Sequence, residues 1–190
     1  GPGAIVFENG GYLYRLELAS EKVSRIPVYI ADDQSRSRPE LIKVADKITG
    51  FDLAPDGARA LFGARGEVFT VPAKNGNTRN LTNTSSVHER EATWSPDGRW
   101  IAYIADPTGG DEIYIRLQDG SGQPVQLTSN SDSYKYALLW SPDSRKILWS
   151  DRLFRLRYID IDKKQIVEVA KGKTWEIHDY TWSPDSNWVA

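Results

Sequence analysis

Three serines occupy a repeated position where a nucleophile could stand. Ser95, Ser141 and Ser183 each precede Pro-Asp, and the two histidines of the chain, His88 and His178, could serve as bases. A serine triad needs one serine singled out beside one base, whereas these serines recur with no histidine at a constant offset. The pattern predicts that the serines are structural, that the chain has no catalytic residue and that it is not an enzyme by itself.

The acidic residues and glycines have equally plain explanations. An aspartate follows the proline of each turn, where it can accept backbone N–H groups. Other neighbouring acids lack the ligand spacing and central glycine of a calcium loop, and the paired glycines lead into strand-like segments and not into helices. The residues concerned are Asp56, Asp97, Asp143 and Asp185 in the turns, Asp106, Asp111, Glu112, Asp160 and Asp162 among the other acids, and Gly109, Gly110, Gly120 and Gly122. With no cysteine available either, we expect no metal site, no cofactor and no phosphate cradle.

Four copies of this turn divide the chain into repeats. The turn prolines, Pro55, Pro96, Pro142 and Pro184, are 41, 46 and 42 residues apart. An apolar segment precedes each turn and a segment rich in β-formers follows it, which indicates strand, tight turn and strand. Repeats of just over forty residues with strand patterns are typical of propeller blades. The sequence therefore predicts an all-β chain, a β-propeller with four-stranded antiparallel blades.

About four blades are expected. Residues 6–14 align with 61–69, so the first blade enters at its second strand, and residues 188–190 have the same phase as 4–6. An open arc would leave strand edges unpaired, so we expect either a partial ring or half of a ring that a second chain completes. The expected divisions are 1–3 as a cleavage scar, 4–50 as a first blade (strands two to four) with a long connection, 51–82, 83–128 and 129–170 as the next three blades, and 171–190 as the inner strand and turn of a following or closing blade.

Strand bounds follow from the same pattern. The first blade should have strands over 12–18 and 23–30, with an extra strand over 40–44 in the long connection. The later blades should have strands over 51–53, 59–63, 67–71 and 78–81, over 92–94, 100–105, 112–117 and 124–127, and over 137–140, 146–150, 154–161 and 165–169. Trp94, Trp140 and Trp182 share one repeat position, which predicts packing between neighbouring blades, with Leu53 as their smaller substitute.

Unlike residues stand at two equivalent positions just before each inner strand. Scaffold positions should repeat, whereas recognition positions should not, so this connection is a candidate contact surface for peptides at the mouth of a central channel. A solvated loop is the alternative interpretation. The candidates are Lys47, His88, Tyr134 and Glu176 at the first position, and Thr49, Arg90, Tyr136 and His178 at the second.

The charge balance argues against nucleic acid or membrane partners. The 24 basic and 26 acidic residues are interspersed and give a formal charge of −2. Arg152, Arg155 and Arg157 alternate with apolar residues, a pattern that predicts the solvent face of a strand. No apolar run approaches the length of a spanning helix, and the absence of cysteine fits a reducing compartment.

Several longer phrases resemble the propeller region of the tricorn protease family. They are 62–73 (Phe-Gly-Ala-Arg-Gly-Glu-Val-Phe-Thr-Val-Pro-Ala), 78–82 (Thr-Arg-Asn-Leu-Thr), 88–90 (His-Glu-Arg) and 92–103, which contains Trp-Ser-Pro-Asp-Gly. The last motif also occurs in TolB-like propellers. The first phrase is more specific and looks like the early part of the second propeller of the tricorn family.

The resemblance implies a large cytoplasmic serine peptidase, whose catalytic residues belong to a region that nothing in this chain matches. This chain would then be a non-catalytic propeller portion that gates or guides oligopeptides towards that core. The alternatives are a TolB-like protein-interaction scaffold, and an isolated propeller fragment that forms a homodimer without activity. The expected partners are accordingly peptides, other domains of the parent protease, or a second copy bound through open blade edges.

Overall fold

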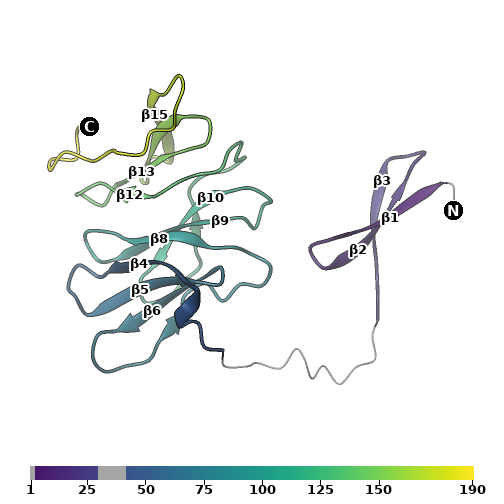
Figure 1. Cartoon of the computed structure of the whole chain (residues 1–190), viewed down its shortest axis with the longest axis horizontal. Helices are drawn as coiled ribbons and strands as arrows, with labels where there is room; N and C mark the ends of the chain where they lie inside the picture. Colours follow the sequence, from purple (N-terminus) through teal and green to yellow (C-terminus); the bar gives the residue numbers. More distant parts are fainter. Residues whose placement is uncertain (1–2, 30–41) are drawn as a thin grey trace. The chain divides into compact units, whose positions relative to one another are not determined.

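The computed structural model describes residues 3–29 and 42–190 (Figure 1). Within these ranges the regular structure is β-strand, apart from one short 3-10 turn at Ala45–Lys47. The chain divides into two compact units, residues 1–42 and 43–190. The described residues include no helix long and apolar enough to cross a membrane. The expectation of an all-β chain is confirmed.

The first unit is a three-stranded antiparallel meander. Its strands β1 (Ala4–Asn9), β2 (Tyr12–Glu17) and β3 (Lys22–Ile26) pair in the order β1-β2-β3. Gly10 and Gly11 connect the first two strands with φ values of 57° and 78°, and such positive values at both turn positions suit a tight hairpin. The unit contains the three strands expected of a blade that enters at its second strand.

Part of the long connection expected after this meander, residues 30–41, lies outside the described residues. The extra strand expected over 40–44 therefore falls partly outside them as well. Its last three residues, 42–44, have no regular structure, and the turn Ala45–Lys47 leads directly into the next strand.

The second unit contains three antiparallel sheets of four strands, each a simple meander (Figure 1). The second blade contains β4 (Ile48–Leu53), β5 (Arg59–Ala64), β6 (Glu67–Pro72) and β7 (Arg79–Asn80); the third contains β8 (Arg90–Trp94), β9 (Trp100–Ala105), β10 (Glu112–Leu117) and β11 (Val125–Gln126); the fourth contains β12 (Leu139–Trp140), β13 (Lys146–Ser150), β14 (Arg155–Asp160) and β15 (Gln165–Lys171). The first strand of each sheet is the inner one, because β4 lies against β8 and β8 against β12. This is the strand arrangement of neighbouring propeller blades.

The expected strand over 23–30 is shorter in the structure, because β3 ends at Ile26 and residues 27–29 have no regular structure, beginning with a proline that has no N–H to pair. The inner strands also differ from the expected bounds. β4 and β8 begin at Ile48 and Arg90, earlier than the expected 51 and 92, and both contain a register shift against the next strand. Glu91 occupies the shift in β8 with a φ of 52°. A bulge adds a residue to one strand and interrupts the alternation of side chains, so the apolar pattern does not reveal the strand beyond it. In the fourth blade the same stretch is reduced to an isolated bridge between Lys135 and Asp151.

The repeated tryptophans pack between blades, as the sequence predicts. Trp94, Trp140 and Trp182 are 6%, 5% and 8% exposed, and each lies in a cluster that includes residues of the preceding sheet. Leu53 is the exception, because it is 64% exposed. It stands on β4, the first strand of its unit, so the unit contains no preceding sheet to cover it.

The Ser-Pro-Asp turns show why serine and aspartate recur. Ser95 Oγ donates to Asp97 Oδ1 at 2.6 Å and accepts the N–H of Trp100 at 2.9 Å. The Asp97 carboxylate also accepts a backbone N–H two residues further on, at 3.0 Å. Equivalent bonds form around Ser141 and Ser183. The structural role predicted for the serines is confirmed.

The fourth residue of the turn links neighbouring blades when it is serine. Ser144 Oγ accepts the N–H of Asp97 at 3.0 Å, and Ser186 Oγ accepts the N–H of Asp143 at 3.0 Å. Both serines have φ near 60°, a region that usually favours glycine, and Gly98 stands at this position in the third blade. A hydrogen bond across the blade boundary therefore offsets part of the backbone cost of serine.

The prediction that the arginine cluster faces solvent is wrong for two of its three members. Arg155 and Arg157 side chains are 14% and 15% exposed, and they donate to the fully buried Asp151 carboxylate at 2.9 and 2.6 Å. Arg152 alone is exposed. A buried carboxylate requires paired charge, and this requirement prevails over the alternation of polar and apolar residues.

Candidate functional site at the blade rim

The eight candidate contact residues lie in four segments, 47–49, 88–90, 134–136 and 176–178, which we call the rim. Each segment lies at or before the start of an inner strand, or at the corresponding place before Trp182. Each inner strand runs from the rim to a Ser-Pro-Asp or Ala-Pro-Asp turn, so the rim and the turns are at opposite ends of the blades. The early start of β4 and β8 places Thr49 and Arg90 inside strands, where a loop was expected.

Arg90 links the third blade to the fourth. Its guanidinium lies over the Tyr134 ring, with 3.8 Å from Cζ to the ring centroid, and it also pairs with the carboxylate of Asp111. The same carboxylate accepts the backbone N–H of Lys135 at 2.9 Å. A cation held over an aromatic face contributes about 0.5–1 kcal/mol at an exposed site. These contacts hold the Tyr134 ring, which is 47% exposed, in a defined position on the surface.

Aromatic contacts continue from Tyr134 to the last segment. The Tyr134 and Tyr136 rings are 5.2 Å apart, and the Tyr136 and His178 rings are 6.3 Å apart, both edge to face. The Tyr136 hydroxyl donates to Glu176 Oε1 at 2.7 Å, and this hydrogen bond raises the pKa of the tyrosine. Glu176 also lies 3.5 Å from His178 Nε2. One continuous series of side-chain contacts thus crosses two blade boundaries. Its members are Arg90, Tyr134, Tyr136, Glu176 and His178.

The other three candidates do not join this series. Lys47 is exposed and lies 3.6 Å from Asp46, while Thr49 Oγ1 donates to the Gly63 carbonyl at 3.3 Å. The His88 side chain is exposed, and its backbone N–H is held by Asp106 at 2.7 Å. The structure therefore brings together five of the eight candidates.

A buried glutamate lies between the two candidate positions of the third blade. Glu89 is 3% exposed, its Oε1 accepts the hydroxyl of Thr84, and its Oε2 has no partner in the described part of the chain. Burial, with a smaller contribution from the nearby Glu67 and Asp106 carboxylates, raises the pKa of Glu89 to about 7 against the opposing effect of hydrogen bonds from Thr84 and Thr82. This carboxyl group therefore changes charge near neutral pH, inside the rim segment 88–90.

The fourth blade has a buried lysine at the equivalent position. Lys135 Nζ donates to Ser131 Oγ at 2.7 Å and to the Asp111 carbonyl, and it lies 3.9 Å from Glu112. Burial lowers its pKa. The sequence analysis did not select Glu89 and Lys135. They stand at a third repeat position, between the two candidate positions, where the residues also differ from blade to blade and could have been noticed. The four equivalent residues are Ile48, Glu89, Lys135 and Ile177.

The chemistry of the rim suits binding. It presents the Tyr134 ring and the His178 imidazole, which are 47% and 65% exposed, with the Glu176 carboxylate beside them. The Arg90 side chain is 11% exposed and supports the Tyr134 ring from within. The described residues contain no cluster of three His, Cys, Asp or Glu that could hold a metal ion. Among them, no hydrogen bond joins His88 or His178 to a serine, and the repeated serines lie at the opposite end of the blades.

Residues 48–190 match a family model described as the tricorn protease second beta propeller domain. The chain belongs to this family. The resemblance stated from the sequence is thereby confirmed, and so is the expectation of a β-propeller fold.

Relatives of this tricorn propeller chain are considerably longer than it is. It is 23% identical over 187 residues to a tricorn protease homolog of Saccharolobus solfataricus, a match that covers 98% of this chain and 17% of the relative. It is 24% identical over 131 residues to tricorn protease homolog 1 of Streptomyces coelicolor, a match that covers 66% of this chain and 12% of the relative. The chain therefore spans less than a fifth of each relative.

Solved structures show the same fold at low sequence identity. The crystal structure of the tricorn protease matches with a TM-score of 0.67 and 17% identity, over 98% of this chain and 18% of that one. TolB from Acinetobacter baumannii matches with a TM-score of 0.60 and 18% identity, over 98% of this chain and 45% of that one. These two likenesses support the propeller architecture of the tricorn propeller chain.

Proposed function

We propose that this chain is the non-catalytic propeller portion of a tricorn-like serine peptidase in the cytoplasm. In this role its rim contacts oligopeptides and guides them towards a catalytic core that lies elsewhere in the parent protein. Family membership supports the proposal that the parent protein is a tricorn-like peptidase, because the matched relatives are named as tricorn protease homologs.

One observation carries the rim assignment, namely the continuous series from Arg90 through Tyr134 and Tyr136 to Glu176 and His178. Solvated loops have no reason to join their side chains across two blade boundaries. Exposed aromatic rings with a neighbouring arginine are the side chains that most often dominate binding surfaces. The series therefore offers stacking surfaces for apolar side chains and polar groups for a peptide backbone.

The test is binding of fluorescently labelled oligopeptides, followed by anisotropy. Tyr134→Ala and His178→Ala remove exposed side chains, so both variants should keep the fold and weaken binding by at least about fivefold. Tyr29→Ala is the matched control, because Tyr29 is 92% exposed and lies outside the rim. Equal affinities for all four proteins would contradict the rim assignment.

A TolB-like interaction scaffold is the alternative from a different class. The structural likeness to TolB gives it support. The protein sequence encoded by the full-length gene distinguishes the two proposals. A PDZ and protease region downstream favours the peptidase, and its absence favours the scaffold.

We also propose that two copies of this chain pair through open blade edges. The carrying observation is the apolar surface of β4, where Phe51 and Leu53 are 77% and 64% exposed and the second unit contains no sheet to cover them. In addition, β1 pairs with β2 alone, so one edge of the first sheet is unpaired. The pairing would complete the first sheet of one copy with the segment near Tyr180 and Trp182 of the other.

Light scattering at micromolar concentration tests this pairing. The mass should be that of two chains, and Phe51→Asp should reduce it to that of one chain, because a charge would be buried in the contact. A single-chain mass for the unsubstituted protein would refute the pairing and leave the rim assignment untouched.

A further inference from the structure

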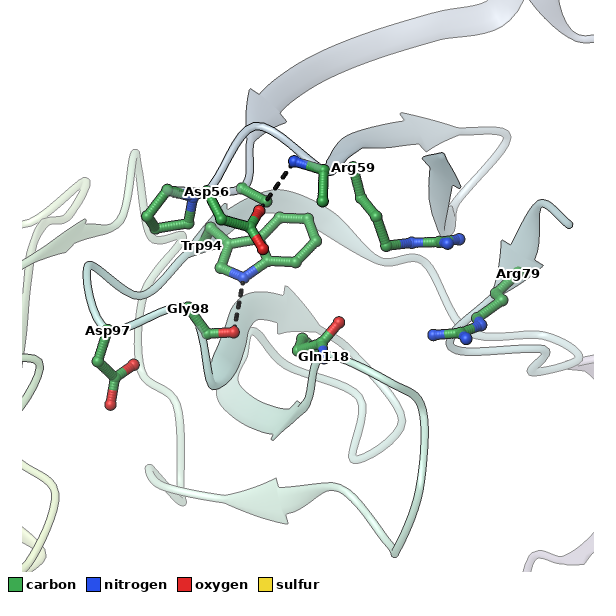
Figure 2. A pocket seen from close by; sticks show the side chains of 10 residues that line it. Asp56, Arg59, Arg79, Trp94, Asp97, Gly98 and Gln118 are labelled. Carbon is green, nitrogen blue, oxygen red and sulfur yellow. Dashed lines mark hydrogen bonds between the residues drawn. The ribbon is translucent and has the colours of Figure 1, made fainter. Parts of the chain in front are cut away.

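A hollow of about 380 Å³ lies at the turn end of the second and third blades, and Figure 2 shows the side chains that line it. The rim is at the other end of the inner strands. The walls of the hollow come from the turns that precede β5 and β9 and from residues that follow β6 and β10. The residues that matter for its chemistry are Asp56, Arg59, Arg79, Trp94, Asp97 and Gln118. None of them belongs to the rim.

The Arg59 guanidinium is fixed in this hollow by neutral groups. Its Nε and Nη2 donate to Thr70 Oγ1 at 3.2 and 3.0 Å, and Nη2 also donates to the carbonyls of Thr70 and Asn77 at 2.9 and 3.0 Å. Thr70 is fully buried, so the arginine is held from below. Within residues 42–190, Nη1 has no hydrogen-bond partner, and no carboxylate lies within ion-pair distance of this side chain. The charge is oriented but not compensated.

Arg79 adds a second uncompensated charge beside the first. It stands on the two-residue strand β7, and Figure 2 shows its side chain directed towards the same space as that of Arg59. No hydrogen bond or ion pair of the Arg79 side chain occurs in the described part of the chain. Burial lowers the pKa of the Arg59 guanidinium, and the nearby charge of Arg79 lowers it further. Two neighbouring guanidinium groups without a counterion favour an anion between them.

In the described part of the chain, the acids around the hollow form no ion pair with either arginine. Asp56 accepts the N–H of Ala58 at 2.8 Å, and Asp97 is engaged by Ser95 within its own turn. In Figure 2 the Asp97 carboxylate points away from the arginines. Asp119 accepts the N–H of Ser121 at 2.8 Å, and hydrogen bonds from Ser121 lower the pKa of Asp119, with a smaller contribution from Arg79. These acids still add negative potential, which disfavours a doubly charged ligand and leaves room for a singly charged one.

We propose that Arg59 and Arg79 form a binding site for a single carboxylate group of a peptide, with Gln118 and the Trp94 indole at its side. The group can be an acidic side chain or a terminal carboxylate. Paired guanidinium groups match the planar geometry of a carboxylate and can donate to both of its oxygens. The site lies apart from the rim and does not depend on the rim assignment.

Amide chemical-shift titration of the whole chain tests the proposal with four small probes. N-acetylglutamic acid amide carries a side-chain carboxylate, N-acetylalanine carries a terminal one, N-acetylglutamine amide is the neutral control and inorganic phosphate is the doubly charged competitor. Either carboxylate probe should shift the signals of residues 56–59, 79, 98 and 118, and the stronger of the two identifies the source. The glutamine probe should shift none of them.

Arg79→Gln should weaken carboxylate binding about tenfold, because one charge-assisted bond is lost. Arg79 is exposed on a short strand, so an unchanged melting temperature should accompany the loss. Arg65→Gln is the matched control and should leave binding unchanged, because Arg65 lies in the turn at the other end of β5. The proposal is overturned if the glutamine probe gives the same shifts as the acid, if phosphate binds more tightly than both carboxylates, or if Arg79→Gln and Arg65→Gln have equal effects.

Discussion

Replacing Glu89 by glutamine should make the stability of this chain less dependent on pH. The pKa of Glu89 is raised from its ordinary 4.5 to about 7 by burial and by neighbouring carboxylates. A carboxyl group with a raised pKa contributes fully to stability below pH 4.5, where it is protonated in both states. The contribution is lost as the pH rises through 7, because the folded chain must then bury a charge. The unsubstituted protein should therefore lose stability between pH 5 and pH 8, relative to Glu89→Gln.

The size of the effect follows from the shift. One pKa unit corresponds to about 1.4 kcal/mol, so a change from 4.5 to about 7 corresponds to about 3 kcal/mol as an upper limit. The glutamine amide keeps an oxygen that can accept from Thr84, and it has no charge to bury. We expect Glu89→Gln to be nearly as stable as the parent at pH 5 and about 2–3 kcal/mol more stable at pH 8.

Urea unfolding followed by tryptophan fluorescence at pH 5 and pH 8 measures this difference. Glu91→Gln is the matched control, because Glu91 is exposed two residues further along the chain. That control should change stability little at either pH. If the parent and Glu89→Gln showed the same pH dependence, Glu89 would be ionised without cost and the reasoning about its burial would be refuted.

Three further substitutions test the packing and polar contacts of the blades. Trp140→Ala should lower the free energy of unfolding by about 3–5 kcal/mol, and an unchanged melting temperature would refute packing between blades. Ser186→Ala keeps the backbone strain but leaves the N–H of Asp143 without its partner, and it should cost about 1–3 kcal/mol in urea unfolding; unchanged or increased stability would show that this bond does not stabilise the blade boundary. Asp151→Asn removes the buried partner of two arginines and should cost about 3–5 kcal/mol, whereas a gain at neutral pH in the same assay would contradict the ion-pair network.

The repeat was sufficient to predict much of the fold. The turn chemistry of Ser95 and Asp97 is local, so sequence alone predicts both the hairpin and the structural role of the serine. The packing of Trp94 between blades is equally predictable, because a large apolar residue that recurs once per repeat is expected to be buried against the neighbouring blade. Strand two and strand three of the third blade, β9 and β10, have the expected bounds for the same reason.

The remaining features depend on contacts between distant residues. Register shifts at the start of β4 and β8 interrupt the alternation that reveals a strand. Arg155 is buried because it pairs with the buried carboxylate of Asp151. The alternation of polar and apolar residues around Arg155 does not predict this. Glu89 and Lys135 each stand between two candidate contact residues in the sequence. Only the structure shows that these two charged side chains point inward.

The most direct test of the rim assignment is photo-cross-linking of an oligopeptide that carries a photoreactive side chain, followed by mass spectrometry of the linked residues. The predicted result is cross-links concentrated in residues 88–90, 134–136 and 176–178, and reduced by an excess of unlabelled peptide. Cross-links that spare all four rim segments would contradict the assignment.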